Sequence, residues 1–194
     1  LEPDYTIIGG GVVGLSVAYG LTRLGRRVTV IDGKDNAYRA SRTNFGLVWV
    51  QSKGLNAPHY ARWSQASARE WRAFADDLQI ASGNELSLRQ DGGYDFHLDE
   101  DSLAERVASY EALKQKLGGD YPFEVLGHNA LKREEPNIGL GVVGAILHHN
   151  DGHVNPLRLL QTLASELRKL GGVLMSGRTT TGIAALKGGG FRIV

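Results

Sequence analysis

The chain has 194 residues, of which 42% are hydrophobic and 22% charged, a composition typical of a folded globular protein. Its 22 lysines and arginines balance 21 aspartates and glutamates, which excludes a nucleic-acid binder held by bulk charge and a polybasic membrane patch. The chain has no cysteine, and this excludes disulfides, thiolate catalysis, iron–sulfur clusters and a flavin tethered through cysteine.

The first 32 residues predict a strand, a helix and a second strand. Residues 4–8 are a β-rich run that ends in three glycines, and apolar residues then recur at helical spacing as far as Leu24. Gly25 is placed to end this helix, and residues 27–31 form the second strand. A unit of this length predicts two parallel strands joined by a crossover helix.

A loop and a long helix follow. Residues 33–56 lack periodicity and predict a loop, in which residues 47–50 are a short apolar run. Pro58 opens the helix. Five large apolar residues fall on one face of it, and we interpret them as core residues rather than as the lining of a ligand site: Tyr60, Trp63, Trp71, Phe74 and Leu78.

The middle of the chain predicts a small antiparallel sheet with helices. The runs at 86–89 and 94–98 alternate apolar and polar residues around Asp91-Gly92-Gly93 and predict a pair of antiparallel strands. The other elements expected here are a helix capped near Asp99 and stopped at Gly118-Gly119, strands over 123–126 and 142–148, and a short helix over 129–135.

The last part of the chain predicts a helix and three short strands. Pro156 opens the helix, which closes at Gly171-Gly172. The strands are expected over 173–176, 180–185 and 191–194. Because the chain begins with Leu1 rather than methionine, we expect a trimmed chain or a fragment.

Gly9 to Gly14 read Gly-Gly-Gly-Val-Val-Gly, the pattern GxGxxG between a predicted strand and a predicted helix. Gly9 allows the tight turn, Gly11 lets the backbone approach a pyrophosphate, and Gly14 lets the helix pack closely. Asp32 ends the second strand and can accept hydrogen bonds from a ribose diol. The fingerprint predicts a dinucleotide but leaves NAD and FAD open, while the acid disfavours NADP.

His148, His149 and His153 lie near Asp151, a set that would in principle suit zinc. Consecutive residues of a strand point to opposite faces, so His148 and His149 cannot converge. We therefore expect no metal site.

The sequence resembles the FAD-dependent amine and amino-acid oxidoreductases of the D-amino-acid oxidase superfamily. Three stretches carry the resemblance: the fingerprint through Asp32, the loop Ala40-Ser41-Arg42-Thr43-Asn44-Phe45-Gly46, and Asp151-Gly152-His153-Val154-Asn155-Pro156. With residues 47–51, the second stretch is most similar to the opine oxidase and hydrogen cyanide synthase subunits. The family usually has valine where this chain has Thr180.

The resemblance implies a Rossmann-like α/β fold with a parallel sheet that binds FAD, plus part of an antiparallel-sheet substrate domain. The FAD-binding domain would comprise residues 1–83 and 150–194, and the substrate domain residues 84–149. Together with the fingerprint, it gives as cofactor-binding residues Gly9, Gly11, Val12, Val13, Gly14, Asp32, Ser41, Asn44, Phe45, Gly46 and Thr180. It covers about half of a family member, so we assign no catalytic residue and expect the 194-residue chain alone to be inactive.

The function that follows is oxidation of the C–N bond of an amino acid or a secondary amine such as an opine, by hydride transfer to flavin. We expect a cytoplasmic protein, free or at the membrane periphery, and a partner subunit or self-association. The alternative is an inactive nucleotide-binding module, or a truncated pseudo-enzyme that needs a partner chain. An NAD-dependent dehydrogenase is the third interpretation.

Overall fold

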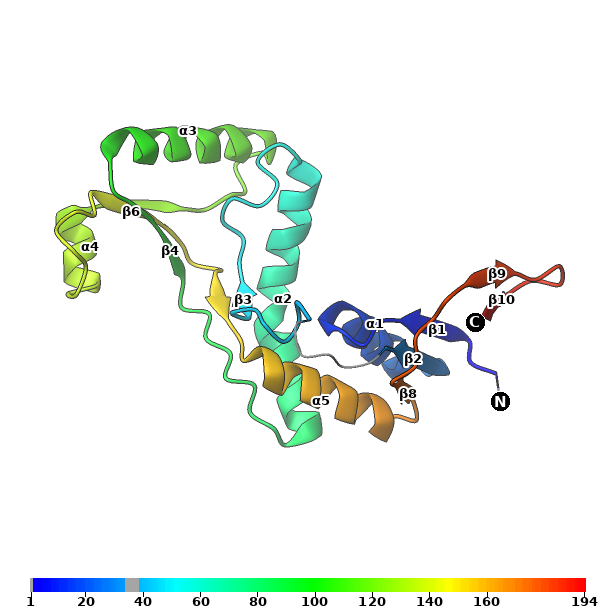
Figure 1. Cartoon of the computed structure of the whole chain (residues 1–194). Coiled ribbons are helices and arrows are strands. Elements are labelled where there is room, and N and C mark those ends of the chain that lie inside the picture. Colours follow the sequence, from blue (N-terminus) through cyan, green and yellow to red (C-terminus); the bar gives the residue numbers. More distant parts are fainter. Residues whose placement is uncertain (1, 34–38) are drawn as a thin grey trace. The chain divides into compact units, whose positions relative to one another are not determined.

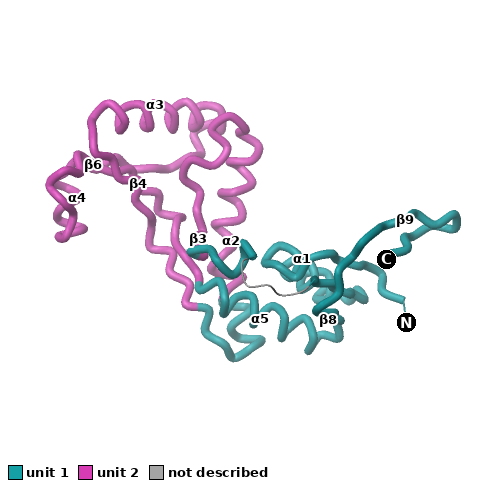
Figure 2. Tube along the Cα trace, viewed as in Figure 1, with its two compact units in different colours: residues 1–45, 76–86, 155–194 teal, residues 46–75, 87–154 magenta. Residues whose placement is uncertain are grey.

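The computed structural model describes residues 2–33 and 39–194 (Figure 1). Contacts between Cα atoms divide the chain into two compact units, coloured separately in Figure 2. The first contains residues 1–45, 76–86 and 155–194, and the second residues 46–75 and 87–154. The expected FAD-binding and substrate domains were defined by function, and their boundaries stay a prediction.

The first unit is built on a three-stranded parallel sheet with the strand order β1-β2-β8. Its strands are β1 (Tyr5–Ile8), β2 (Val28–Asp32) and β8 (Val173–Ser176). The central strand places Val28 and Val30 in the core, since alternate residues of a strand share a face. The parallel pairing of β1 with β2 confirms the strand–helix–strand prediction.

Two helices, α1 (Val12–Arg23) and α5 (Pro156–Lys169), pack against each other and against this sheet. Their buried residues are Leu15, Ala18 and Tyr19 of α1 and Leu159, Leu163 and Leu167 of α5. Gly25, with φ of 73°, follows the end of α1 as expected. The Asn155 side chain caps α5 by accepting from the backbone N–H groups of Leu157 and Arg158, both at 3.1 Å.

The first unit ends in a two-stranded antiparallel hairpin of β9 (Ile183–Ala185) and β10 (Phe191–Ile193). The strand expected over 180–185 therefore begins three residues late. Gly182 and Val194 exchange backbone hydrogen bonds of 3.2 and 2.9 Å, which continues the register of the hairpin by one pair. The Thr181 backbone N–H also donates to the Val194 carbonyl, at 2.6 Å.

The second unit contains a three-stranded antiparallel sheet with the order β4-β6-β5. The strands are β4 (Gly93–His97), β5 (Glu124–Gly127) and β6 (Gly144–His148), with the helices α3 (Glu100–Lys116) and α4 (His128–Glu134). A shorter ladder pairs β3 (Leu47–Val48) with β7 (Gly152–His153). The core gathers around Tyr110, Leu113, Tyr121 and Ile146, all nearly inaccessible to solvent.

The expected pairing of 86–89 with 94–98 is wrong. Strand β4 pairs with β6 instead, and Arg89 makes an isolated bridge to His153 with mutual backbone hydrogen bonds of 2.7 and 2.8 Å. Ser87, with φ of 55°, departs from extended geometry and interrupts the expected strand. A distant segment thus provides the pairing that the local sequence pattern assigned to a hairpin.

The interpretation of the aromatic face of α2 (Pro58–Ser82) as core is wrong at its N-terminal end. Leu78 is fully buried and Trp71 packs against the core, but Trp63 is 69% exposed and Tyr60 42% exposed. At this end of the helix the core is contacted by Ala61 and Ala68 instead, both of which are buried. In the described part of the chain, no helix combines the length and hydropathy that a membrane span requires.

Candidate functional site

The glycine-rich segment forms the turn between β1 and α1. Gly9 has φ of 105°, a backbone conformation that side chains other than glycine rarely adopt. A Cβ atom on Gly14 would collide with the Gly9 carbonyl oxygen. The first and last glycines of the fingerprint are therefore required by the geometry of the turn and by the close approach of helix to turn.

The N-terminus of α1 opens next to this turn. Gly11 occupies the N-cap position with an extended backbone, and the first N–H groups of the helix lack carbonyl partners four residues back. Val12 is partly buried, whereas Val13 is 74% exposed. Backbone N–H groups and the positive end of the helix dipole make this terminus suited to a phosphate.

Asp32 reaches this turn from the last position of β2. Its Oδ1 atom accepts a hydrogen bond from the Gly10 backbone N–H at 2.9 Å. A Cβ atom on Gly10 would lie 2.9 Å from the Asp32 Cγ atom. The absence of a side chain at Gly10 therefore leaves room for the carboxylate. Sequence reasoning missed Gly10 because the fingerprint treats this position as free.

Ser41 contacts the end of the same turn, where α1 begins. Its Oγ atom accepts from the Val12 backbone N–H at 3.0 Å, and it would lie 2.9 Å from a Cβ atom on Gly11. The structure thus brings Ser41, Asp32 and the fingerprint glycines together, although Ser41 is 29 residues away from Val12. The hydroxyl takes up the first free N–H of α1 and lies where an anion would bind.

The residues that follow Ser41 form a tight turn. The Asn44 side chain donates to the Ala40 carbonyl at 2.8 Å, and Phe45 is 86% exposed. Gly46 belongs to the second unit, where its carbonyl accepts from the Val154 backbone N–H at 2.9 Å. Of the expected flavin-loop residues, only Ser41 contacts the glycine-rich turn through a hydrogen bond in the described part of the chain.

The segment before β9 lies at the end of β2. The Arg178 backbone N–H donates to the Asp32 carbonyl at 2.9 Å. The Oγ1 atom of Thr180 is buried and has no hydrogen-bond partner among the described residues. A valine in this position would leave no polar atom to satisfy, so the departure from the expected pattern places a buried hydroxyl without a described partner in this segment.

Arg39 is a second residue that sequence reasoning missed. Its Nη1 atom contacts the Asp32 Oδ1 atom at 2.5 Å, with the Asp32 side chain 18% exposed and the Arg39 side chain 38% exposed. Its neighbours Ala40 and Ser41 were singled out, but no motif marked the arginine itself. Only the fold brings it to the carboxylate.

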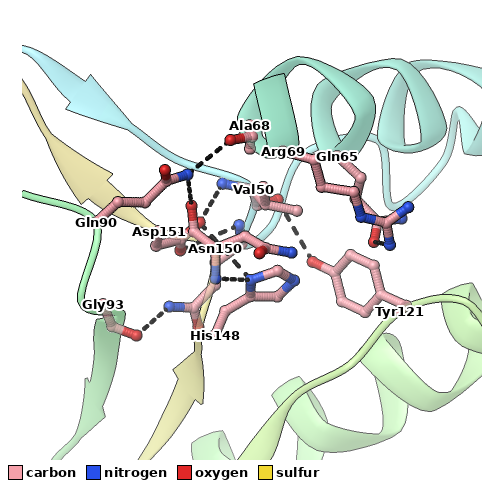
Figure 3. Close-up of polar contacts among 11 residues, drawn as sticks. Val50, Gln65, Ala68, Arg69, Gln90, Gly93, Tyr121, His148, Asn150 and Asp151 are labelled. Carbon is pink, nitrogen blue, oxygen red and sulfur yellow. Dashed lines mark hydrogen bonds and ion pairs between the residues drawn. The ribbon is translucent and has the colours of Figure 1, made fainter. Parts of the chain in front are cut away.

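A buried polar cluster lies in the second unit (Figure 3). The Asp151 carboxylate is inaccessible to solvent and accepts from the backbone N–H groups of Val50 at 2.5 Å and Gln51 at 3.4 Å. The Tyr121 hydroxyl donates to the Val50 carbonyl at 3.4 Å. The His148 Nδ1 atom is 3.9 Å from Asp151 Oδ1. These contacts hold the backbone at residues 50–51 in place.

Burial controls the ionisation of this cluster. It raises the pKa of Asp151 to about 6, against the opposing effect of its hydrogen bonds from Val50 and Gln51. Burial also lowers the pKa of His148 to about 4, so the imidazole is neutral near pH 7. His149 follows the end of β6 and is exposed, and no three metal-ligating side chains converge in the described part of the chain.

Comparison with known proteins identifies the family. A family model described as "FAD dependent oxidoreductase" matches residues 4–194. The chain belongs to this family. It is 45% identical to an opine oxidase subunit of Agrobacterium tumefaciens (strain Ach5), over all of this chain and 54% of the relative. It is 27% identical to glycine oxidase of Bacillus licheniformis, over 87% of this chain and 43% of the relative.

Solved structures share the fold of this chain. Glycine oxidase from Bacillus cereus ATCC 14579 superposes with a TM-score of 0.81 at 25% identity, over 96% of this chain and 49% of that structure. Glycine oxidase from Geobacillus kaustophilus superposes with a TM-score of 0.87 at 22% identity, over 98% and 50% respectively. This confirms the expected α/β fold. The chain spans about half the length of the relatives that it matches.

Proposed function

We propose that this chain is the FAD-binding part of an oxidoreductase that oxidises the C–N bond of an amino acid or of a secondary amine such as an opine. One observation carries the proposal: Asp32, Ser41 and the glycine-rich turn converge on the N-terminus of α1. The substrate class is supported by the names of two relatives, an opine oxidase subunit and a glycine oxidase.

The residues present fit FAD. The N-terminus of α1 and the Ser41 hydroxyl would hold the pyrophosphate, because Gly11 leaves no side chain between them. The Asp32 carboxylate would accept from the ribose hydroxyls. The buried Thr180 hydroxyl lies in the segment expected to meet the adenine. Asn44, Phe45 and Gly46 would line the path to the flavin ring.

When bound, the flavin would supply the redox chemistry, the acceptance of a hydride from the carbon that bears nitrogen. The residues of this chain bind and orient the dinucleotide. The groups that bind substrate are not assigned, because the relatives extend over about twice the length of this chain.

A second candidate is a nucleotide-binding module without activity of its own, or a pseudo-enzyme that acts only with a partner chain. The observation that favours it is the coverage of about half of each relative, together with the description of one relative as a subunit. In that case the chain binds FAD but oxidises nothing alone. An NAD-dependent dehydrogenase is the third candidate, since the fingerprint itself suits either dinucleotide.

The decisive experiment is a titration of the purified chain with FAD, NAD and NADP, followed by the quenching of flavin fluorescence and by the melting temperature. We expect FAD alone to bind and to raise the melting temperature, and Asp32→Ala to abolish both effects. A response to NAD but not to FAD would contradict the proposal.

Activity is tested next, with amino acids and opines in the presence of an artificial electron acceptor. Reduction of the acceptor by an opine or an amino acid supports the enzyme. FAD binding without turnover, by the chain alone and with the partner that co-purifies with it, supports the inactive module. Size-exclusion chromatography of the same sample tests the expected partner subunit or self-association.

A further inference from the structure

Arg39 joins two parts of the nucleotide site that the sequence keeps apart. Its guanidinium contacts the carboxylate at the end of β2, while its own backbone begins the turn that carries Ser41. The Arg39 carbonyl accepts from the Arg42 backbone N–H at 2.8 Å and from the Thr43 hydroxyl at 3.2 Å. The turn is thus held at two points, by Arg39 on Asp32 and by Ser41 on the N-terminus of α1.

The two oxygen atoms of the Asp32 carboxylate differ in their contacts. Both the Gly10 backbone N–H and the Arg39 Nη1 atom contact the Oδ1 atom of Asp32, at 2.9 and 2.5 Å. In the described part of the chain, the Oδ2 atom takes no hydrogen bond. Two donors on one oxygen fix the rotation of the carboxylate and leave its other oxygen to a ligand.

The guanidinium also lies beside the segment before β9. A Cβ atom built on Gly33 would be 3.2 Å from the Arg39 Nη2 atom and 3.4 Å from the Thr179 hydroxyl. The Arg39 guanidinium and the Thr179 side chain therefore both lie close to Gly33, the residue after β2. This is the end of the site where the adenosine of a dinucleotide is expected.

We propose that Arg39 is a positioning residue for the adenosine half of the cofactor. It fixes the Asp32 carboxylate with one oxygen turned to the ribose diol, and it ties the turn at residues 39–44 to the end of β2. The inference rests on the proposed function, because it assumes that the dinucleotide binds here. It adds a cation to a fingerprint defined by glycines and one acid.

The effect of Arg39 on nucleotide affinity should depend on Asp32. Truncation in Arg39→Ala frees the carboxylate to rotate, and we expect about tenfold weaker binding of FAD and of ADP, which share the adenosine half. Arg39→Lys keeps the charge but loses the planar fork, so it should recover about half of the loss on a logarithmic scale. In an Asp32→Asn background, Arg39→Ala should change the dissociation constant by less than about twofold.

The test is a double-mutant cycle on Asp32 and Arg39, read by titration with FAD and with ADP as the probe of the adenosine half. Arg26→Ala, which removes the same charge from an exposed side chain of the first unit, is the matched control. We expect the control to bind as the parent chain does, and the melting temperatures of all ligand-free variants to agree within a few degrees.

The outcomes separate this inference from the proposed function. If the parent chain binds neither FAD nor ADP, the proposed function fails. If it binds both while Arg39→Ala binds equally well, or while the Arg39→Ala loss persists in full in the Asp32→Asn background, the positioning role alone fails. A loss matched by Arg26→Ala would likewise assign the effect to bulk charge and overturn the inference.

Discussion

Two aspartates of this chain do the same local chemistry in different surroundings. In the first unit, Asp32 accepts a hydrogen bond from the Gly10 backbone N–H and contacts a guanidinium, with its side chain 18% exposed. In the second unit, Asp151 accepts from the backbone N–H groups of Val50 and Gln51 and is inaccessible to solvent. Each carboxylate holds a backbone segment that is distant in sequence.

The difference lies in what the second carboxylate oxygen can do. In Asp151 both oxygens accept from buried backbone groups, so the side chain is committed to the fold. In Asp32 the contacts with Gly10 and Arg39 converge on one oxygen, and partial exposure leaves the carboxylate accessible to a ligand. A buried carboxylate with both oxygens engaged stabilises structure, and a partly exposed one with a single oxygen engaged is suited to binding.

The sharpest test of this contrast is to remove each carboxylate. Asp151→Ala leaves two buried backbone N–H groups without an acceptor and should lower the free energy of unfolding by about 3 kcal/mol. Asp32→Ala should lower it by less than about 1 kcal/mol. Urea denaturation followed by tryptophan fluorescence measures both. Equal losses for the two variants would remove the distinction.

The pH dependence of stability tests the ionisation of the buried cluster. The folded pKa of Asp151, about 6, exceeds its ordinary value of 3.8, so this group makes the fold less stable as pH rises from about 4 to 6. The folded pKa of His148, about 4, lies below its ordinary value of 6.5, so this group makes the fold less stable as pH falls from 6.5 to about 4. The two effects oppose each other.

Removing either group should therefore reveal the effect of the other on the pH dependence of stability. As the pH falls from 6.5 to about 4, the free energy of unfolding of Asp151→Asn should decrease relative to that of the parent chain, because only the His148 effect remains. The free energy of unfolding of His148→Gln should increase over the same range, because only the Asp151 effect remains. Each change should be on the order of 2 kcal/mol. Urea denaturation at several pH values gives the two slopes. Parallel slopes for both variants and the parent would show that neither group is perturbed in the folded state.

The glycine-rich turn offers a matched pair of substitutions. Gly14→Ala forces a Cβ atom against the Gly9 carbonyl, and we expect a loss of about 2 kcal/mol in the free energy of unfolding and a loss of FAD binding. Gly20→Ala lies in the same helix with nothing within 4 Å of its new Cβ atom, and it should stabilise by about 0.5 to 1 kcal/mol. A neutral Gly14→Ala would contradict the close packing at the turn.

Asp32→Asn changes the structure least and tests the binding role of Asp32 directly. Asp32→Asn keeps the shape and an acceptor for the Gly10 N–H but loses the charge, so we expect about tenfold weaker FAD binding. The melting temperature of the ligand-free chain should shift by no more than about 2 °C. Calorimetric titration checks the first value. An unchanged affinity would place the ribose elsewhere.

The elements that the sequence predicted well are those whose signals are local. The β1-α1-β2 unit follows from a β-rich run, three glycines and a helical apolar period, and all of these lie within 32 residues. Helix α3 begins where Asp99 offers a cap, which accepts from the Ser102 N–H at 2.8 Å. Such signals depend on neighbouring residues, so the chain carries them before it folds.

The predictions that were wrong depended on distant segments. Arg89 pairs with His153 rather than with residues 94–98, because backbone pairing is decided by which strands meet. Trp63 is exposed although it continues the apolar stripe of α2, because this end of the helix contacts the core through the small residues Ala61 and Ala68 instead. The cofactor roles of all the predicted site residues stay predictions, those of Asp32 and Ser41 included.

The sequence by itself determined the family and the fingerprint, because a turn of glycines with an acid 18 residues further on is a short-range pattern tied to one backbone geometry. Only the tertiary structure decided which partners these residues take. It places Arg39 on Asp32, Ser41 on the N-terminus of α1, and Asp151 against the backbone of residues 50–51. Contacts of this kind depend on how the elements pack, and packing joins residues between which the sequence carries no periodic signal.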